Sequence, residues 1–263
     1  PSKSLLDSSL KHYHLLNQFE DHGLHVDGLK LDLDKMMSRK QDVITQLTNG
    51  VGALFKSNKV DFISGIAKIK NRNEVEIIQD SKTETLETQN IIIATGSNPI
   101  ELENIKFDEN IVDSEEALKF DRVPKQIVVI GAGVIGLELS SVWSRLGSNV
   151  TLLEAQNEFL PVLDKRISRQ IFREFENQGL KILLDSKVLE VRQDSSEIEV
   201  TYSIKEEEFK LKAEKIIVAV GRKAHTKDLF EDDLIEIDNH GLITVDNFCQ
   251  TSEKNIWAIG DVV

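Results

Sequence analysis

Three closely spaced glycines are the residues of this chain whose types and positions most clearly predict chemistry. Gly131, Gly133 and Gly136 directly follow the apolar run at residues 127–130. In this spacing the first glycine permits a tight turn, the second lets the backbone approach a pyrophosphate, and the third lets the next helix pack closely on the strand. The glycines therefore predict a dinucleotide-binding turn, provided that a strand precedes them and a helix follows.

The flanking sequence supplies that context. The run at 127–130 is short and rich in β-branched residues, which is typical of a buried parallel strand. Ile135, Leu139 and Val142 then recur at intervals of three and four, as the apolar stripe of a helix does. A second apolar run at 149–153 predicts the next strand. We therefore interpret the stretch as a β-α-β unit rather than as an ordinary glycine turn.

An acid closes the second strand of this unit. Glu154 lies a little over twenty residues after the first glycine, where an acid can accept hydrogen bonds from an adenosine ribose and would repel a 2′-phosphate. Residues 155–157 contain no lysine or arginine that could receive such a phosphate. The sequence therefore favours NAD over NADP.

Composition limits the class of protein. With 263 residues, 40% of them hydrophobic, and no apolar run of membrane-spanning length, the chain is expected to be a soluble globular protein of one large or two ordinary domains. A net charge of −13 argues against nucleic acid as a partner, because a phosphate backbone is bound by clustered lysine and arginine. We also expect no membrane association.

No metal site is predicted. Four histidines lie close together in sequence, but their spacing fits no common ligand pattern and no cysteine accompanies them: His12, His14, His22 and His25. The single cysteine, Cys249, is expected to be a small, partly buried side chain. Without a signal segment or a cysteine pair, a reducing compartment is the default expectation.

Two helices and three strands are expected before the glycine motif. Residues 4–19 have helical spacing, and Asp32 is a suitable N-cap for a long second helix. The apolar residues of that second helix predict one buried face: Val43, Ile44, Leu47, Val51, Leu54 and Phe55. Gly50 and Gly52 within it suggest close packing. Strands are expected at 60–69, 74–79 and 86–94, followed by the small-residue turn at 95–97.

Residues 99–125 are acidic and poor in pattern, so we expect a connection between two domains there. After Glu154 the pattern predicts a helix at 164–178 and then the strands at 181–184, 188–193, 197–204, 208–211, 215–220, 242–245 and 255–259. Asp261 follows the last of these. An acid at the carboxyl end of a parallel strand lies where ligands bind in open α/β sheets, although a turn aspartate is also an ordinary feature.

Three separated segments resemble the signatures of one known family, the flavoprotein disulfide reductases. They are residues 92–97, residues 215–222 and residues 258–261. Residues 1–3 look like the segment directly after that family's redox-active cysteine pair, and residues 137–147 resemble its dihydrolipoyl dehydrogenase branch most closely.

The resemblance implies an α/β fold class with two Rossmann-like (three-layer ββα) domains that bind FAD and NAD, one inserted in the other. The FAD-binding domain would consist of residues 1–120 and 225–263, and the NAD-binding domain of residues 121–224. The chain would be a piece of a longer protein, without the first glycine-rich FAD turn and without a carboxyl-terminal dimerisation domain.

The resemblance also implies FAD contacts. Asp261 would bond the flavin ribitol, Thr95, Gly96 and Ser97 would pass beside the FAD, and Lys3 would approach the isoalloxazine. A turn at residues 65–67 would place the backbone of Ala67 against the adenine.

On the NAD side the resemblance implies two groups of residues. Those that would cradle the pyrophosphate are Gly131, Ala132, Gly133, Val134, Ile135 and Gly136. Those that would contact the rest of the cofactor are Glu154 at the ribose, Val188 at the adenine, Glu138 at the nicotinamide, and Ala219, Val220, Gly221 and Arg222 along its length. Lys3 and Glu138 would form a buried ion pair.

The implied reaction is the oxidation of lipoyl dithiols of 2-oxo-acid dehydrogenase complexes, with electrons passing through a protein disulfide and FAD to NAD. The disulfide cysteines and the family's histidine and glutamate acid-base pair are not in this chain, so no catalytic residue is assigned and the chain by itself is expected to be inactive. The resemblance further implies that the whole protein is a homodimer, located in the bacterial cytoplasm or in the mitochondrial matrix. The alternatives are another FAD-dependent disulfide reductase, a soluble transhydrogenase, or a non-catalytic nucleotide-binding module.

Overall fold

The structure is a computed structural model that describes residues 1–80, 82–194, 197–231 and 234–263. It forms two compact units. Unit 1 consists of Pro1–Val51 and Ile100–Gly221, and unit 2 of Gly52–Pro99 and Arg222–Val263. The predicted cofactor domains have different limits and stay predictions, because the units are defined by packing and not by a bound cofactor.

A five-stranded parallel sheet is the centre of unit 1. Its strand order is β6-β13-β7-β8-β9, with bounds β6 Ile111–Val112, β13 Lys215–Val218, β7 Gln126–Ile130, β8 Asn149–Leu153 and β9 Lys181–Leu183. The crossover helices are α3 (Val134–Arg145), between β7 and β8, and α4 (Lys165–Asn177), between β8 and β9. The predicted β-α-β unit is therefore confirmed.

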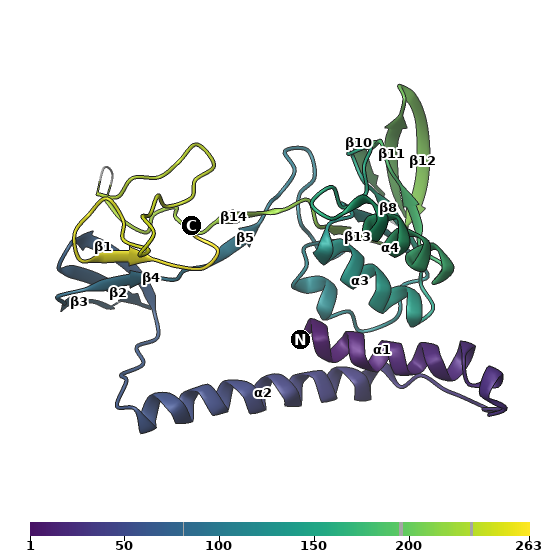
Figure 1. Cartoon of the computed structure of the whole chain (residues 1–263), viewed down its shortest axis with the longest axis horizontal. Helices are drawn as coiled ribbons and strands as arrows, with labels where there is room; N and C mark the ends of the chain where they lie inside the picture. Colours follow the sequence, from purple (N-terminus) through teal and green to yellow (C-terminus); the bar gives the residue numbers. More distant parts are fainter. Residues whose placement is uncertain (81, 195–196, 232–233) are drawn as a thin grey trace. The chain divides into compact units, whose positions relative to one another are not determined.

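Both faces of this sheet are covered, as the continuous apolar runs predict. Ile127 and Val129 of β7 lie in a core with α3, whereas Val128 and Ile130 lie in a second core. That second core includes Val200 of a separate antiparallel sheet, seen in green in Figure 1, whose strands are β10 (Ser186–Gln193), β11 (Ile198–Ile204) and β12 (Glu207–Ala213). Unit 1 thus has three layers: antiparallel sheet, parallel sheet and helices.

Helix α1 (Ser2–Asn17) belongs to the helical layer of unit 1. It packs against α3, as Figure 1 shows, and its Leu5 is fully buried in the core that contains Trp143. The Trp143 indole Nε1 donates to the carbonyl of Ala117, 3.1 Å away. Ala117 lies in the 3₁₀-helix η2 (Glu116–Leu118), and a second 3₁₀-helix, η1 (Glu20–His22), follows α1.

Helix α2 (Leu33–Ser57) begins as predicted, with the Asp32 carboxylate accepting from the amide of Lys35 at 2.9 Å. Its predicted buried face is wrong, because Leu47 is 66% exposed and Leu54 is 62% exposed. Gly50 and Gly52 also have open space beside them rather than close neighbours. Periodicity fixes which residues share a stripe, but among the described residues no element covers this one.

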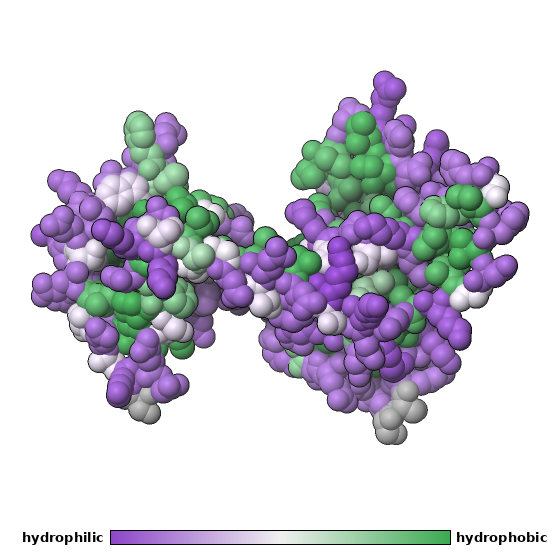
Figure 2. All heavy atoms as spheres, turned by 90° about the horizontal axis from the view of Figure 1, so that it is seen from below, coloured by the Kyte–Doolittle hydropathy of each residue, from purple (hydrophilic) through white to green (hydrophobic). Residues whose placement is uncertain are grey.

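Unit 2 is built from smaller sheets. An antiparallel meander contains β1 (Ile66–Asn71), β2 (Glu74–Gln79) and β3 (Lys82–Glu87), β4 (Ile91–Ile93) pairs in parallel with β15 (Ile256–Ala258), and β5 (Ser97–Pro99) pairs in antiparallel with β14 (Arg222–Ala224). Ile69, Ile91 and Ile256 lie in its core. Figure 2 shows hydrophobic residues reaching a mostly hydrophilic surface. In unit 2, Ile92 is 65% exposed.

Three expectations about short segments are wrong. Residues 99–125 are not only a connection, because Ile111 and Val112 form an edge strand of the parallel sheet. Residues 242–245 are not a strand and contain only an isolated bridge at Ile243. The first strand begins at Ile66 rather than at residue 60. Two-residue pairings and isolated bridges depend on distant partners, which local pattern does not encode.

Candidate nucleotide-binding sites

The glycine turn after β7 has the geometry that its spacing predicts. Gly131 has a φ of 101°, and a Cβ there would lie 2.5 Å from the carbonyl oxygen of Ala219. A Cβ at Gly136 would lie 2.1 Å from the carbonyl oxygen of Gly131. Because real Cβ atoms do not approach backbone so closely, the predicted roles of Gly131 in the turn and of Gly136 in close packing are confirmed.

The second glycine differs from the other two. A Cβ at Gly133 would meet nothing within 4 Å. Gly133 is also the N-cap of α3, whose first turn receives no side-chain capping hydrogen bond. Uncapped amides and the positive end of a helix dipole favour an anion at this position. The turn thus has open space beside Gly133, at the start of a helix whose first amides have no side-chain cap.

Glu154 connects the glycine turn to the loop after β8. One carboxylate oxygen accepts from the amide of Ala132 at 2.8 Å, and the other accepts from the amide of Gln156 at 2.9 Å. Each oxygen retains a second lone pair, so the carboxylate can still accept from a ribose hydroxyl. The bond to Ala132 is not evident from sequence, because it joins residues 22 apart.

The ends of β7 and β13 lie side by side, and the predicted residues after β13 follow there. The amide of Ala219 donates to the carbonyl of Ile130 at 2.8 Å, which brings Ala219 beside the turn. Neighbouring strands whose crossovers run in opposite directions form the switch point where α/β sheets bind ligands. Val220 is partly exposed and Gly221 has a φ of 133°. Ala132 is buried, whereas Val134 and Ile135 are exposed at the start of α3.

Val188 lies in β10, near the same end of the sheet. The amide of Ser186, two residues earlier, donates to the carbonyl of Glu154 at 2.8 Å. Val188 itself is half-buried and packs against the second core of unit 1. The structure therefore brings Val188, Glu154 and the glycine turn together within one unit.

The predicted ion pair between Lys3 and Glu138 does not form among the described residues of unit 1. Lys3 is exposed, and Glu138 is half-buried on α3 without an ion-pair partner within 4.0 Å. At 3.6 residues per turn, Lys3 points about 160° away from Leu5, whose side chain faces the core. The predicted roles of Lys3 and Glu138 toward cofactors stay predictions.

In unit 2 the predicted flavin residues form a hydrogen-bonded network. The Ser97 hydroxyl donates to the Asp261 carboxylate at 2.7 Å. The Thr95 hydroxyl donates to the carbonyl of His225, and the amide of His225 donates to the carbonyl of Gly96, each at 2.9 Å. The small-residue turn is therefore tied to both later segments of the unit.

Arg222 joins this network rather than the glycine turn. Its Nε donates to the Ser97 hydroxyl at 2.7 Å, and its side chain also bonds the Ser97 carbonyl. The family resemblance implies that Arg222 lies along the NAD with Ala219, and that role stays a prediction. The chain crosses from unit 1 to unit 2 between Gly221 and Arg222, and local pattern contains no signal of that crossing.

Ala67 lies within β1, opposite Ile77, so the predicted turn at 65–67 is wrong. The chain instead bends at Gly65, where φ is 157° and a Cβ would lie 2.7 Å from the Ile77 side chain. The backbone of Ala67 is thereby engaged with β2.

Sequence patterns did not predict the buried charge at Lys40. This residue of α2 is 7% exposed, and its Nζ donates to the carbonyl of Leu118 at 2.7 Å. Burial, with a smaller contribution from Lys119, lowers the pKa of Lys40 below its ordinary value. Lysine on an amphipathic helix is normally solvated, so composition carries no signal of this bond.

Two general properties concern the described residues as a whole. None of their helices combines the length and the apolar character needed to cross a membrane. Within the same ranges, no group of three histidine, cysteine or acidic side chains is arranged to hold a metal ion.

Comparisons with known proteins agree with this architecture. The family described as pyridine nucleotide-disulphide oxidoreductase matches residues 2–263. Dihydrolipoyl dehydrogenase of Cupriavidus necator is 41% identical over 266 residues, an alignment that covers 100% of this chain and 56% of the relative. The mitochondrial dihydrolipoyl dehydrogenase of Pisum sativum is 38% identical and is covered over 54% of its length. The chain thus spans about half the length of these curated relatives.

A solved structure gives the same result for the fold. The Cu(II) complex of the HOCl-induced flavoprotein disulfide reductase RclA from Escherichia coli is similar with a TM-score of 0.83 and 25% sequence identity. The similarity covers 100% of this chain and 55% of that one. The predicted α/β fold class, with FAD- and NAD-binding Rossmann-like domains, is confirmed by this match.

Proposed function

The chain belongs to the pyridine nucleotide-disulphide oxidoreductase family, and from this premise we propose that it is the nucleotide-binding part of an NAD-dependent dihydrolipoyl dehydrogenase. Unit 1 would bind NAD, and unit 2 would bind FAD. The relatives named above support the activity, which is proposed for the whole protein because the chain spans about half of their length.

The observation that carries the proposal is the shape of the glycine turn. Open space beside Gly133 and the uncapped start of α3 fit a pyrophosphate, while Glu154 offers carboxylate lone pairs to a ribose. In unit 2, the carboxylate of Asp261 and the hydroxyl of Ser97 are polar groups suited to a ribitol chain. When bound, the two cofactors would supply the hydride and electron transfer.

The residues of this chain would bind the two cofactors and orient them. Backbone amides of α3 would hold the NAD pyrophosphate, and Ala219 to Gly221 would border the cofactor where β7 and β13 adjoin. Arg222 would act on the flavin side, through Ser97, rather than along the NAD. Glu138 would face the nicotinamide, and Lys3 would approach the isoalloxazine.

The wider context is part of the proposal. The substrate would be the lipoyl groups of 2-oxo-acid dehydrogenase complexes, and the protein would act as a homodimer. A bacterial cytoplasm or a mitochondrial matrix would be its location, in keeping with the bacterial and mitochondrial relatives.

The test is a coupled assay on the full-length protein. We expect dihydrolipoamide to drive the formation of NADH, with NADP a poor substitute. Reduction of a different disulfide substrate by NADH, without turnover of dihydrolipoamide, would assign the protein to another branch of the family.

A further inference from the structure

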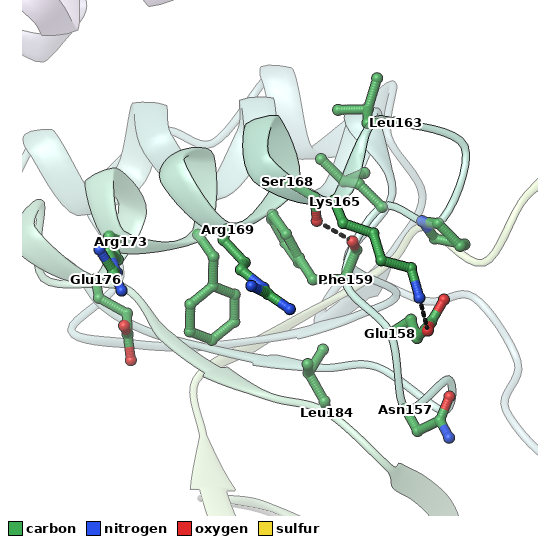
Figure 3. Close-up of a pocket in the computed structure, with 13 residues that line it drawn as sticks. Asn157, Glu158, Phe159, Leu163, Lys165, Ser168, Arg169, Arg173, Glu176 and Leu184 are labelled. Atoms are coloured by element: carbon green, nitrogen blue, oxygen red, sulfur yellow. Dashed lines mark hydrogen bonds and ion pairs between the residues drawn. The ribbon is translucent and has the colours of Figure 1, made fainter.

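Unit 1 contains a hollow that is not part of the glycine turn. It lies between α4 and the loop at residues 157–163, and its volume is about 510 Å³. Figure 3 shows side chains from the helix and the loop directed into it. A volume of this size is within the range of small-molecule sites, which is roughly 300 to 1,000 Å³.

The floor of the hollow is apolar and held in place. Phe159 is 7% exposed and meets Phe172 edge to face, with ring centroids 5.1 Å apart and planes at 80°. Leu184 forms the opposite wall. The Ser168 hydroxyl donates to the carbonyl of Phe159, which fixes the loop to α4. A flat apolar group can therefore be buried there without rearrangement of the backbone.

The rim of the hollow is cationic. Lys165, Arg169 and Arg173 follow one another at intervals of four residues and so share one face of α4. Lys165 forms an ion pair with Glu158, with Nζ and the carboxylate oxygen 3.2 Å apart. Among the residues that the structure describes, neither Arg169 nor Arg173 forms an ion pair within 4.0 Å. Their guanidinium groups are thus available to a ligand.

We propose that this hollow binds a small organic anion whose flat apolar body rests on Phe159 and Phe172 and whose carboxylate or phosphate is held by Arg169 and Arg173. Guanidinium groups bind planar oxyanions in a bidentate manner. Arg169 and Arg173 are exposed, so the charged group of the ligand would remain near solvent. Glu176, also on the rim, would repel a second anionic group of the ligand. The site is independent of the proposed flavin reaction.

The site is also distinct from the glycine turn. The loop that closes it follows Gln156, whose amide is bonded by Glu154. None of the residues that line the hollow is among those proposed to contact NAD, so NAD should not displace the anion.

The test is calorimetric titration of the full-length protein with 2-naphthoate, a fused aromatic ring system with one carboxylate. We expect binding that Arg169→Gln weakens roughly tenfold, because a charge-assisted hydrogen bond is lost. Arg166→Gln is the matched control, because Arg166 lies on the same helix and does not line the hollow. Its affinity for 2-naphthoate should equal that of the unmodified protein.

Further titrations measure separately how the charge and the rings of the ligand contribute to its affinity. 2-Naphthamide, which lacks the charge, and acetate, which lacks the rings, should each bind more weakly than 2-naphthoate. Phe172→Leu should weaken 2-naphthoate without loss of the folded state. Equal affinities of the Arg169 and Arg166 variants, no binding of 2-naphthoate, or its displacement by NAD would each overturn the proposal.

Discussion

The two units use different means to build the sites proposed for their cofactors. In unit 1 most of the site is local in sequence, since the turn, the helix start and the acid all lie within residues 126–154, and later segments add Val188 and Ala219 to Gly221. In unit 2 the network joins segments that are 125 and 164 residues apart, through Ser97 to Arg222 and to Asp261. The first site is made mainly of backbone, and the second is linked by side chains.

This difference predicts that the two sites differ in their sensitivity to single substitutions. Where a Cβ added at a glycine would lie only 2.1 to 2.5 Å from a backbone oxygen, a single methyl group is disruptive. Where exposed side chains hold segments together, a single substitution removes a modest amount of free energy. Each unit also contains one of the chain's two tryptophans, Trp143 in unit 1 and Trp257 in unit 2. Replacing either tryptophan by phenylalanine leaves a fluorescence reporter for the other unit.

The largest expected effect tests whether α1 is a part of unit 1. Leu5→Ala should lower the free energy of unfolding of unit 1 by about 2 to 5 kcal/mol, because Leu5 is fully buried. Denaturant unfolding followed by Trp143 fluorescence in a Trp257→Phe background measures this. Leu16→Ala, at an exposed position of the same helix, is the control and should change little. Equal effects of the two substitutions on the free energy of unfolding would show that α1 is not a part of unit 1.

The next effect concerns the backbone of the glycine turn. Gly136→Ala should cost about 1 to 3 kcal/mol and should abolish NAD binding, since the new Cβ overlaps the Gly131 carbonyl. Gly133→Ala should leave the unfolding transition almost unchanged, because its Cβ meets no atom, yet should weaken NAD binding. Calorimetric titration with NAD and thermal melting separate the two outcomes. Wild-type NAD binding by both variants would show that the turn does not hold the cofactor.

A smaller effect is expected in the side-chain network of unit 2. Ser97→Ala should cost about 0.5 to 1.5 kcal/mol, because it removes the hydroxyl shared by Arg222 and Asp261. A double-mutant cycle with Arg222→Gln should show a coupling free energy of about 0.5 kcal/mol or more. The full-length protein should lose affinity for FAD and keep its affinity for NAD. Loss of affinity for NAD instead would indicate that Arg222 acts at the NAD site and not at the FAD site.

The smallest effect is a pH dependence confined to unit 1. The pKa of Lys40 is lowered in the folded state, chiefly by burial, so the folded protein releases this proton first. Stability should therefore rise relative to Lys40→Met as the pH increases from below the folded-state pKa toward 10.5, the unfolded value. Melting temperatures of both proteins at neutral and alkaline pH measure the difference. A fall in the stability of the unmodified protein relative to Lys40→Met as the pH rises would contradict the assigned direction.

The glycine turn could be predicted from sequence because its determinants are local. Gly136 is required by its contact with Gly131 inside one β-α-β unit, whose strands and helix have clear periodicity. Gly131 is required by its positive φ and also by the distant carbonyl of Ala219, which the spacing of the glycines does not show. The same reasoning correctly placed the start of α2 at Asp32.

The remaining features depend on partners that periodicity does not specify. The stripe on α2 predicted a buried face, but whether Leu47 and Leu54 are buried depends on what packs on them. The family resemblance implied a place for Arg222 along the NAD, but its hydrogen bonds to Ser97 depend on the pairing of residues 222–224 with residues 97–99, which has no local signal. The bond from Lys40 to Leu118 joins residues 78 apart and has no local signature.

The measurement that tests the central claim most directly is the affinity of the full-length protein for NAD and for NADP, with and without Glu154→Gln. We predict that NADP binds at least roughly tenfold more weakly than NAD, because the carboxylate repels a 2′-phosphate. Glu154→Gln should weaken NAD binding, because it disturbs the hydrogen bonds to Ala132 and Gln156. It should also reduce the difference between the affinities for NAD and NADP, because the repelling charge is lost. Equal affinities for NAD and NADP in the unmodified protein would contradict the assignment of unit 1 as an NAD site.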